Sequence, residues 1–441
     1  MPRARRPAAR ASKRKAEAQT LDLKLIRRDP EGVKAALARR GAAERVDELL
    51  ELDRRRRELL PEIEERRARQ NKVSEEIAAA KKAGEDASET IAAMRELAAE
   101  VKRLEAELAE VEQGIEELLP TIPNLPDPTV PAGETEEDAE VLREVGDRPQ
   151  FEFEPRDHLE IGVELGLIDM ESAAKASGSR FAYLKRELAL MEFALVQFAF
   201  AKLVAKGFVP VVPPVLVREE ALFWTGFLPT DRAQIYEIAG DDLFLVGTSE
   251  VTLAAQHADE IFAEEDLPLR YAGFSTCFRR EAGAAGKDTR GIFRVHQFDK
   301  VEMFEFVHPD RSHSEHDFLL ATEEEILQEL GIPYRVVNIP AGDLGASAAK
   351  KYDLEAWLPG QGRYRELTSC SNTTDYQARR LRARFRPAEG GSVQHVHTLN
   401  GTAVAVGRTL IALIENFQRA DGGFAVPEAL HAYGAPAEVG P

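Results

Sequence analysis

Cysteine is scarce in this sequence, and long apolar runs are missing. The 441 residues include two cysteines, Cys277 and Cys370, which is too few for a disulfide scaffold or for a four-cysteine zinc site. No apolar run approaches the roughly 18 residues that a membrane span needs. We therefore expect a protein of the reducing cytoplasm without a membrane partner.

The sequence also lacks several nucleotide-binding and metal-binding signatures. Residues 283–289 contain two glycines and a lysine, but they fail the spacing of a phosphate loop, in which four residues separate the first glycine from Gly-Lys. No G-x-G-x-x-G follows a strand-like segment, and no H-E-x-x-H occurs. His313 and His316 stand one helical turn apart without a third ligand, so we expect an ordinary surface helix there.

Acidic residues outnumber basic ones, and basic residues concentrate at the start of the chain. There are 58 Lys and Arg against 77 Asp and Glu, for a net charge of −19. The first 20 residues hold seven basic residues and one acid, a net of +6, so the remainder carries −25. We interpret residues 1–20 as an unstructured basic tail. A nucleic-acid-binding arm and an organelle transit peptide are the alternatives.

Residues 42–119 predict two long helices that fold back on each other. Apolar residues on the second helix alternate spacings of three and four, which is the seam of a coiled coil. Residues 83–86 separate the helices and favour an antiparallel hairpin. Pro61 removes one helical N–H and should kink the first limb. The seam consists of Leu49, Leu52, Leu59, Ile63, Val73 and Ile77 on the first limb and of Met94, Leu97, Val101, Leu104, Leu108, Val111, Ile115 and Leu118 on the second.

The two limbs of this hairpin differ in charge. The first limb, residues 42–82, has 11 basic and 11 acidic residues, whereas the second, residues 83–119, has 3 and 11. A solvated charged face on a structural or dimerisation spacer would explain the pattern. A basic limb that binds phosphates is the other interpretation, and both stay open on charge alone.

The rest of the chain divides into a linker, a larger domain and a short tail. Five prolines between residues 120 and 131 indicate an irregular linker at 120–150, which ends the arm of residues 21–119. Helical patterns and half-polar, strand-like runs then alternate over 151–430. Half-polar strands favour a mainly antiparallel sheet flanked by helices, an α+β fold. The helical patterns lie at 184–206, 313–330 and 403–420, example strands at 208–212, 243–246 and 301–306, and the C-terminal tail at 431–441.

Charged residues occur on strand-like segments, where burial must be compensated. Arg279 and Glu281 alternate by two, so we expect both on one side of a strand. Arginine suits bidentate binding of phosphate or carboxylate oxygens, and a carboxylate next to a hydroxyl, as at Glu366 and Ser369, suits Mg²⁺. Each residue alone is explained by an ordinary salt bridge. Together with Glu302 and Arg408 they predict a site for an anionic, metal-linked ligand.

These residues belong to motifs that occur in a specific order and spacing. The motifs are Gly207 to Pro214, Thr248-Ser249-Glu250, Cys277 to Gly283, Lys287 to Gly291, His296 to Glu302, Glu366 to Asn372 and Asn400 to Arg408. They resemble the motifs of bacterial-type seryl-tRNA synthetases, a class II aminoacyl-tRNA synthetase family. The resemblance spans about residues 21–420.

The resemblance implies a class II catalytic domain, with a mainly antiparallel sheet flanked by helices, in a cytoplasmic homodimer. It implies that ATP and L-serine form a seryl-adenylate, from which serine passes to serine tRNA and to selenocysteine tRNA where that is present. Mg²⁺ would accompany ATP, with Glu366 and Ser369 as its ligands.

The resemblance also implies roles for individual residues. Arg279, Glu302 and Arg408 would be catalytic, with Arg279 on the α-phosphate and the serine carboxylate, and with Phe298 and Arg408 around the adenine ring. The serine site would be Thr248, Ser249, Glu250, Arg279, Glu302, Asn400 and Thr402. The ATP site would be Arg279, Arg280, Glu281, Val295, Phe298, Glu366, Leu367, Thr368, Ser369 and Arg408.

The arm would bind the tRNA. Basic residues of the first limb, among them Arg55, Arg66, Arg69 and Lys81, would contact mainly the sugar-phosphate backbone of the tRNA. Two alternatives to this function remain. A ligase that aminoacylates a carrier protein would share the catalytic fold but lack the long arm. A catalytically inactive paralogue would have lost the arginines and carboxylates named above, all of which are present.

Overall fold

The computed structural model describes residues 22–282, 286 and 288–441. These residues form two compact units, which meet in sequence at Ile122 and Pro123. The predicted basic tail, residues 1–20, lies outside the described residues.

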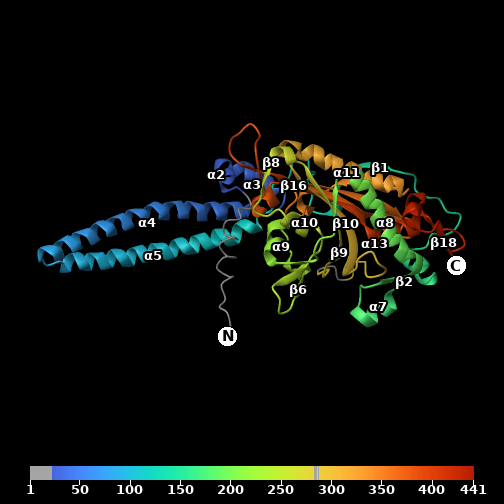
Figure 1. Ribbon diagram of the computed structural model, residues 1–441, viewed down its shortest axis with the longest axis horizontal. Helices are drawn as coiled ribbons and strands as arrows, with labels where there is room; N and C mark the ends of the chain where they lie inside the picture. Colours follow the sequence, from blue (N-terminus) through green and yellow to red (C-terminus); the bar gives the residue numbers. More distant parts are fainter. Residues whose placement is uncertain (1–21, 283–285, 287) are drawn as a thin grey trace. The chain divides into compact units, whose positions relative to one another are not determined.

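The first unit is entirely helical and ends in the predicted hairpin (Figure 1). Two short helices, α2 (Leu23–Arg28) and α3 (Pro30–Ala38), precede the long helices α4 (Glu44–Ala83) and α5 (Ser88–Leu118). Asp29 caps α3 by accepting from the backbone of Gly32, with proline at the first helical position. Gly84 ends α4 in the left-handed conformation that glycine adopts without a Cβ clash. The antiparallel hairpin is therefore confirmed.

A narrow apolar seam holds the two long helices together. Leu59 and Ile63 of α4 pack with Leu104 of α5, and Leu108 and Val111 are half-buried against them. Nearer the turn of the hairpin, Leu97 and Val101 are still buried, whereas Val73, Ile77 and Met94 are only half-buried. Helix α4 runs without interruption through Pro61, and the kink expected there stays a prediction.

The second unit is built on an eight-stranded sheet. The order is β1 (Glu140–Val145), β11 (Tyr334–Asn338), β12 (Lys350–Leu358), β13 (Arg363–Thr374), β16 (His397–Ala405), β10 (Gln297–Val307), β9 (Leu269–Phe278) and β4 (Val209–Val211). Every neighbouring pair is antiparallel except β4 and β9. The predicted, mainly antiparallel sheet is confirmed.

Two segments expected to be irregular instead pair with other strands. Residues 140–145, inside the expected linker 120–150, form the edge strand β1 and pair with β11. Residues 438 and 439, inside the expected tail 431–441, form β18 and pair with β17 (Phe424–Ala425). Both strands are short and lack an alternating apolar pattern of their own, so their partners decide their conformation.

Three helices cover one face of the sheet and build the main core. They are α8 (Arg186–Ala205), α11 (Ser312–Glu329) and α13 (Val406–Asn416), at the places that the sequence predicted. The third begins later than expected because residues 403–405 still belong to β16. On β10, Val301, Met303 and Val307 point into this core. The alternate residues of β10 face the other side of the sheet.

Smaller elements surround the sheet (Figure 1). A second apolar cluster joins Phe304 and Phe306 of β10 to helices α10 and α12. The remaining helices are α6 (His158–Glu164), α7 (Met170–Ser177), α9 (Glu219–Thr225), α10 (Glu250–Ala255) and α12 (Tyr376–Leu381), and the remaining strands are β2 (Ile168–Asp169), β3 (Tyr183–Leu184), β5 (Leu216–Val217), β6 (Tyr236–Ile238), β7 (Leu243–Leu245), β8 (Ile261–Ala263), β14 (Arg384–Arg386) and β15 (Gln394–His395).

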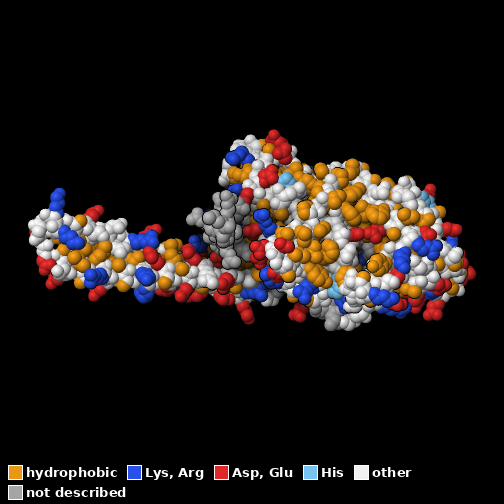
Figure 2. All heavy atoms as spheres, turned by 60° about the horizontal axis from the view of Figure 1, so that its bottom comes forward, with side chains coloured by type: hydrophobic (Ala, Val, Ile, Leu, Met, Phe, Trp, Pro, Cys, Tyr) orange, Lys and Arg blue, Asp and Glu red, His pale blue; other side chains and the backbone are white. Residues whose placement is uncertain are grey.

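Helix α8 is a long apolar helix, although no apolar run of membrane-spanning length was predicted. Among the described residues it is the one helix whose length and composition match a membrane span, a test that core helices of soluble proteins also pass. One side of α8 packs in the main core. On the other side Leu190, Phe193 and Val204 are 55%, 61% and 51% exposed. Figure 2 shows hydrophobic side chains over much of the visible surface of this unit.

Candidate active site

A cavity of about 350 Å³ lies on the sheet face opposite the main core. Phe298, Lys300 and Glu302 line it from β10, because alternate residues of a strand share one face. Most residues predicted for a site come together there: Thr248, Glu250, Arg279, Glu281, Val295, Phe298, Glu302, Glu366, Leu367, Thr368, Ser369, Asn400, Thr402 and Arg408.

Two predicted residues do not line the cavity. Ser249 is buried, and its hydroxyl donates to the carbonyl oxygen of Gly273. Arg280 is exposed, and its guanidinium lies 5.9 Å from the ring centroid of Tyr236. Both flank residues that do line the cavity, and neighbours in a chain point in different directions.

Two bulges in the sheet set which residues face the cavity. The register between β12 and β13 shifts by one residue, so that Thr368 pairs with Leu354 but Glu366 pairs with Glu355. This extra residue places Glu366 on the same side as Ser369, although a regular strand would separate positions 366 and 369 onto opposite faces. A similar shift between β10 and β16 sets Glu302 opposite Thr402.

Arg279 projects into the cavity from the segment after β9. The strand ends at Phe278, so the expectation that Arg279 and Glu281 share a strand face is wrong. Glu281 has a φ of 52°, which belongs to a turn. The Nε of Arg279 donates to the carbonyl oxygen of Gly247 (3.2 Å), and its guanidinium lies 5.2 Å from the ring centroid of Phe298. Within the described residues its two Nη groups have no protein acceptor.

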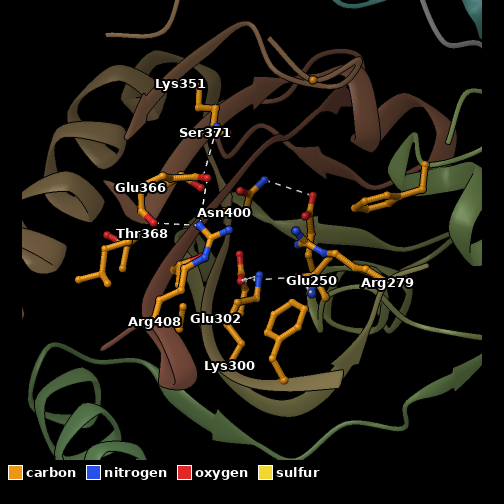
Figure 3. A pocket seen from close by; sticks show the side chains of 18 of the residues that line it. Glu250, Arg279, Lys300, Glu302, Lys351, Glu366, Thr368, Ser371, Asn400 and Arg408 are labelled. Atoms are coloured by element: carbon orange, nitrogen blue, oxygen red, sulfur yellow. Dashed lines mark hydrogen bonds and ion pairs between the residues drawn. The ribbon is translucent and has the colours of Figure 1, made fainter. Parts of the chain in front are cut away.

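Arg408 and Glu366 form an ion pair on another wall of the cavity (Figure 3). The Nη1 of Arg408 donates to both the carboxylate and the backbone carbonyl of Glu366, at 3.0 Å each. The Arg408 guanidinium lies 4.6 Å from the ring centroid of Phe293. Phe298, which was predicted to sandwich the adenine ring with Arg408, lines the cavity and contacts Arg279, and its role at the ring stays a prediction. Phe293 was missed because no charge or pattern distinguishes it in the sequence.

The predicted metal ligands Glu366 and Ser369 both line the cavity. Burial by itself raises the pKa of Glu366, but Arg408 and Lys351 lower it to about 2, so the carboxylate is ionised at neutral pH. Among the described residues no cluster of three or more His, Cys, Asp and Glu could hold a metal ion. One carboxylate and one hydroxyl fit Mg²⁺ that takes its other ligands from water and substrate phosphates.

Ion pairs also fix the segment that follows β9. Glu281 accepts from Nη1 of Arg294 at 2.7 Å, and Asp288 accepts from Arg365 at 2.7 Å. Glu281 was predicted for the ATP site, and Arg294 holds one of its carboxylate oxygens. Arg294 lines the cavity but was not predicted, because nothing in the adjacent sequence indicates that Glu281 is its partner.

Two buried carboxylates mark another part of the cavity. Glu302 pairs with Lys300, which was missed in the sequence although the two residues alternate on one strand. Glu250 accepts from the amide of Asn400 at 3.1 Å. Burial, together with the Glu302 carboxylate, raises the pKa of Glu250 to about 7. The Thr248 hydroxyl donates weakly to Glu302, at 3.5 Å.

The two histidines of α11 lie in different surroundings. His313 is exposed, as a surface helix predicts, but His316 is buried and pairs through Nε2 with the carbonyl oxygen of Cys370 at 3.1 Å. Burial lowers the pKa of His316 to about 4, so the ring is neutral. The expectation of a wholly exposed helix is therefore wrong at His316.

On the arm, the four predicted tRNA contacts fall into two groups. Arg55 is paired with Glu107 at 2.7 Å and Arg66 with Glu100 at 3.1 Å, both across to α5. Arg69 and Lys81 are exposed, and within the described residues no ion pair engages them. Figure 2 shows side chains of both charges along the arm. Sequence alone could not separate the groups, because the acidic partners lie on the other helix.

The cavity combines features for binding anions and a small polar molecule. Arg279 offers free N–H donors to oxygen anions, and Arg408 with Glu366 offers a cation and a metal-competent carboxylate. The buried carboxylates Glu250 and Glu302 suit the donors of a small ligand.

Comparisons with known proteins agree with these features. The seryl-tRNA synthetase N-terminal domain matches residues 20–126, and the class II tRNA synthetase core domain (G, H, P, S and T) matches residues 235–417. The chain is 50% identical to the serine–tRNA ligase of Thermobifida fusca over 94% of this chain and 97% of that one. It is 50% identical to that of Streptomyces coelicolor over 95% and 98%.

A solved structure gives the same result for the fold. The crystal structure of seryl-tRNA synthetase from Pyrococcus horikoshii complexed with ATP matches with a TM-score of 0.89 and 43% identity, over 96% of this chain and 99% of that one. The likeness covers nearly the whole chain, including both the arm and the sheet. The chain belongs to the seryl-tRNA synthetase family.

Proposed function

We propose that this chain joins L-serine to serine tRNA, using ATP and a seryl-adenylate intermediate. The observation that carries the proposal is one cavity that holds a guanidinium with free N–H groups, two buried carboxylates and the Arg408–Glu366 pair. Neither a carrier-protein ligase nor an inactive paralogue is favoured, since the long arm is formed and the charged residues converge.

In the first step Arg279 holds the α-phosphate and the carboxylate of serine. A carboxylate oxygen attacks the α-phosphorus, the bond from that phosphorus to the bridging oxygen breaks, and pyrophosphate leaves. Arg279 stabilises the negative charge that builds during this displacement, and Arg408 neutralises charge on the leaving phosphates. No covalent bond to the protein is needed.

Mg²⁺ with ATP belongs to the same proposal. Glu366 and Ser369 would hold it, and it would supply positive charge to the phosphates when bound. Glu366 suits this role because it stays ionised at neutral pH and is fixed by Arg408.

Glu250, Glu302 and their neighbours recognise the amino acid. A buried carboxylate that accepts from the serine hydroxyl rejects alanine, because alanine leaves that carboxylate unpaired. Thr402 stands opposite Glu302 on β16 and narrows the site from the next strand.

In the second step a ribose hydroxyl of the terminal adenosine attacks the seryl carbonyl carbon. The bond from that carbon to the phosphate oxygen breaks, AMP leaves, and the proton of the ribose hydroxyl is released to water. The arm binds the tRNA by shape and backbone contacts. Serine tRNA, and selenocysteine tRNA where it is present, are the expected partners, in the cytoplasm.

We propose further that the chain is a homodimer. Leu190, Phe193 and Val204 leave an exposed apolar face on α8, and Val209 and Val212 are 53% and 77% exposed on and after β4. Strand β4 also ends the sheet and leaves one edge unpaired among the described strands. Exposed apolar patches and strand edges favour association.

Amino-acid-dependent exchange of pyrophosphate into ATP tests the first step. Serine should support exchange, and alanine and glycine should not. Exchange with alanine or glycine but not with serine would contradict the substrate assignment.

Removal of the arm tests its role. A chain in which a short linker replaces residues 42–119 should retain exchange, because the cavity lies wholly in the second unit, but should lose tRNA charging. Tight serine-tRNA binding by the shortened chain would contradict the assignment of the arm.

A further inference from the structure

Gln377 lies behind the carboxylate Glu250, outside the cavity itself. It is on the first turn of α12 and is fully buried, with 0% of the residue exposed. It is not among the residues that line the cavity. Neither composition nor motif singled it out.

The hydrogen bonds of Gln377 fix the direction of its amide. Its Nε2 donates to Oε1 of Glu250 at 2.6 Å and to the carbonyl oxygen of Thr225 at 3.1 Å. Its Oε1 accepts from the hydroxyls of Thr398 at 2.9 Å and of Thr373 at 3.4 Å. A reversed amide would set its oxygen against a carboxylate and a carbonyl, so only this orientation satisfies all partners.

These bonds leave the two oxygens of Glu250 in different states. Oε1 receives the amides of both Gln377 and Asn400, at 2.6 and 3.1 Å. In the part of the chain that the structure describes, no donor reaches Oε2, and Glu250 lines the cavity. Figure 3 shows Glu250 with its bond to Asn400 at the side of the cavity nearest Arg279. One oxygen is thus occupied by the protein and the other is available to a ligand.

Gln377 also joins the elements that meet at this point. Thr225 ends α9, Glu250 begins α10, and Thr398 is on β16. Arg380, one turn further along α12, is buried and donates to the carbonyl oxygen of Phe223 in α9. Helix α12 therefore packs behind this part of the cavity, and its residue Gln377 bonds the cavity-lining Glu250.

We propose that Gln377 is a positioning residue of the serine site: it holds Oε1 of Glu250 so that Oε2 faces a hydrogen-bond donor of the bound serine. The inference rests on the proposed function, in which Glu250 receives serine. Gln377 acts through Glu250 and does not touch substrate.

The test is Gln377→Glu, which keeps shape but replaces the donating amide. A carboxyl group at 377 faces Glu250, and the two must share a proton or repel, so Oε1 of Glu250 is no longer held by a neutral amide donor. In pyrophosphate exchange the KM for serine should rise at least tenfold, while the KM for ATP stays within twofold. The acidic limb of kcat/KM for serine should move to higher pH. The charged groups near Glu250, which are Glu302, Lys300 and Arg279, are unchanged in this variant.

Gln418→Glu is the matched control. Gln418 is a buried glutamine of the same unit, and its amide bonds the backbone of Arg156 and Glu415. The Gln418→Glu variant measures the general effect of a buried Gln→Glu change. Its thermal midpoint should fall, while its KM for serine should stay within twofold of that of the unaltered chain.

Thr398→Val is the second test variant, and it replaces Gln377→Glu as the test when Gln377→Glu does not fold. It removes one hydroxyl that holds Oε1 of Gln377, and it should raise the KM for serine twofold to fivefold without changing that for ATP. The proposal is overturned if folded Gln377→Glu has an unaltered KM for serine and an unaltered pH profile. If Gln377→Glu does not fold, the same result for Thr398→Val overturns it. Absence of serine-dependent exchange in the unaltered chain would instead overturn the proposed function.

Discussion

Arg279 is held in place by its neighbours, while its Nη groups, among the described residues, stay free to bind a ligand. Its Nε is fixed by Gly247, its plane rests against Phe298, and its Nη groups face the cavity. The guanidinium is therefore preorganised for oxygen anions and need not reorganise as charge develops.

Arg279→Ala should slow adenylate formation. Losing a charge-assisted contact to the transition state costs about 2.7–4 kcal/mol, or about 10²–10³ in kcat. Single-turnover adenylate formation measures the effect, and the thermal midpoint serves as the control for folding. A rate within a few-fold of the unaltered chain would mean that Arg279 does not bind the α-phosphate.

Glu323 on α11 shows a different consequence of burial. Its Oε2 accepts from the hydroxyl of Thr368 at 2.9 Å, and its other oxygen has no partner among the described residues. Burial raises the pKa of this carboxyl well above the ordinary range. A carboxyl whose pKa is raised by folding stabilises the fold fully below its unfolded pKa, and this stability is lost as the pH rises through the folded pKa.

Glu323→Gln should therefore flatten the dependence of stability on pH. Between the pKa of an unfolded glutamate and the raised folded pKa of Glu323, the unaltered chain should lose up to about 1.4 kcal/mol of unfolding free energy per pH unit relative to the variant, and above the folded pKa the difference should stop growing. Urea unfolding between pH 6 and 9 measures this. Glu325→Gln, on the same helix, is the control, since Lys206 and Lys202 lower the pKa of Glu325 and its titration lies below this window. Parallel curves for the chain and Glu323→Gln would contradict a neutral Glu323.

At the scale of elements, the basic side chains of the arm fall into two groups. One group forms ion pairs between the two helices, and the other remains available to bind phosphate. Arg55, Arg66 and Arg67 pair with glutamates of α5. Arg69, Lys72 and Lys81 are exposed and, among the described residues, have no acidic partner. A phosphate must compete with the carboxylate for the first group but meets no competitor at the second.

Arg69→Ala should lower the slope of log affinity for serine tRNA against log salt by about 1, since one phosphate contact is lost. Arg67→Ala is the matched control two residues away, because its guanidinium is engaged by Glu105 at 2.6 Å. Its slope should change less. Filter binding at several salt concentrations distinguishes the two, and equal slopes would contradict the division of the cations into these groups.

At the scale of the whole molecule, the second unit carries an apolar face that a monomer leaves in water. Phe193 is 61% exposed on α8, although its helix neighbours on the other side are buried in the core. Packing this face against the same face of a second copy would remove its apolar surface from water.

Phe193→Asp should disrupt the dimer, because it places a charge in the centre of the apolar face. Light scattering after size exclusion should give twice the chain mass of 48.9 kDa for the unaltered protein and that mass for the variant. Leu60→Asp, at an exposed position of the arm, is the control and should stay dimeric. A monomeric unaltered chain at micromolar concentration would contradict the proposed dimer.

Local pattern was enough to predict much of this molecule. The hairpin followed from apolar residues at spacings of three and four, and Gly84 marked its turn. The antiparallel sheet followed from half-polar strands. The cavity residues were found because their motifs stand in a specific order, and charged residues in strands need a partner.

Only the tertiary structure decided features that depend on partners far apart in the sequence. The bulge beside Leu354 moves Glu366 to the face of Ser369, and a strand pattern alone cannot place such a shift. Strand β1 forms because β11 offers an edge, and Arg55 is engaged because α5 brings Glu107 beside it. Gln377 gains its place from three elements that meet at Glu250. Sequence records local periodicity and residue chemistry, whereas register, burial and the nearest opposite charge arise only when distant segments pack.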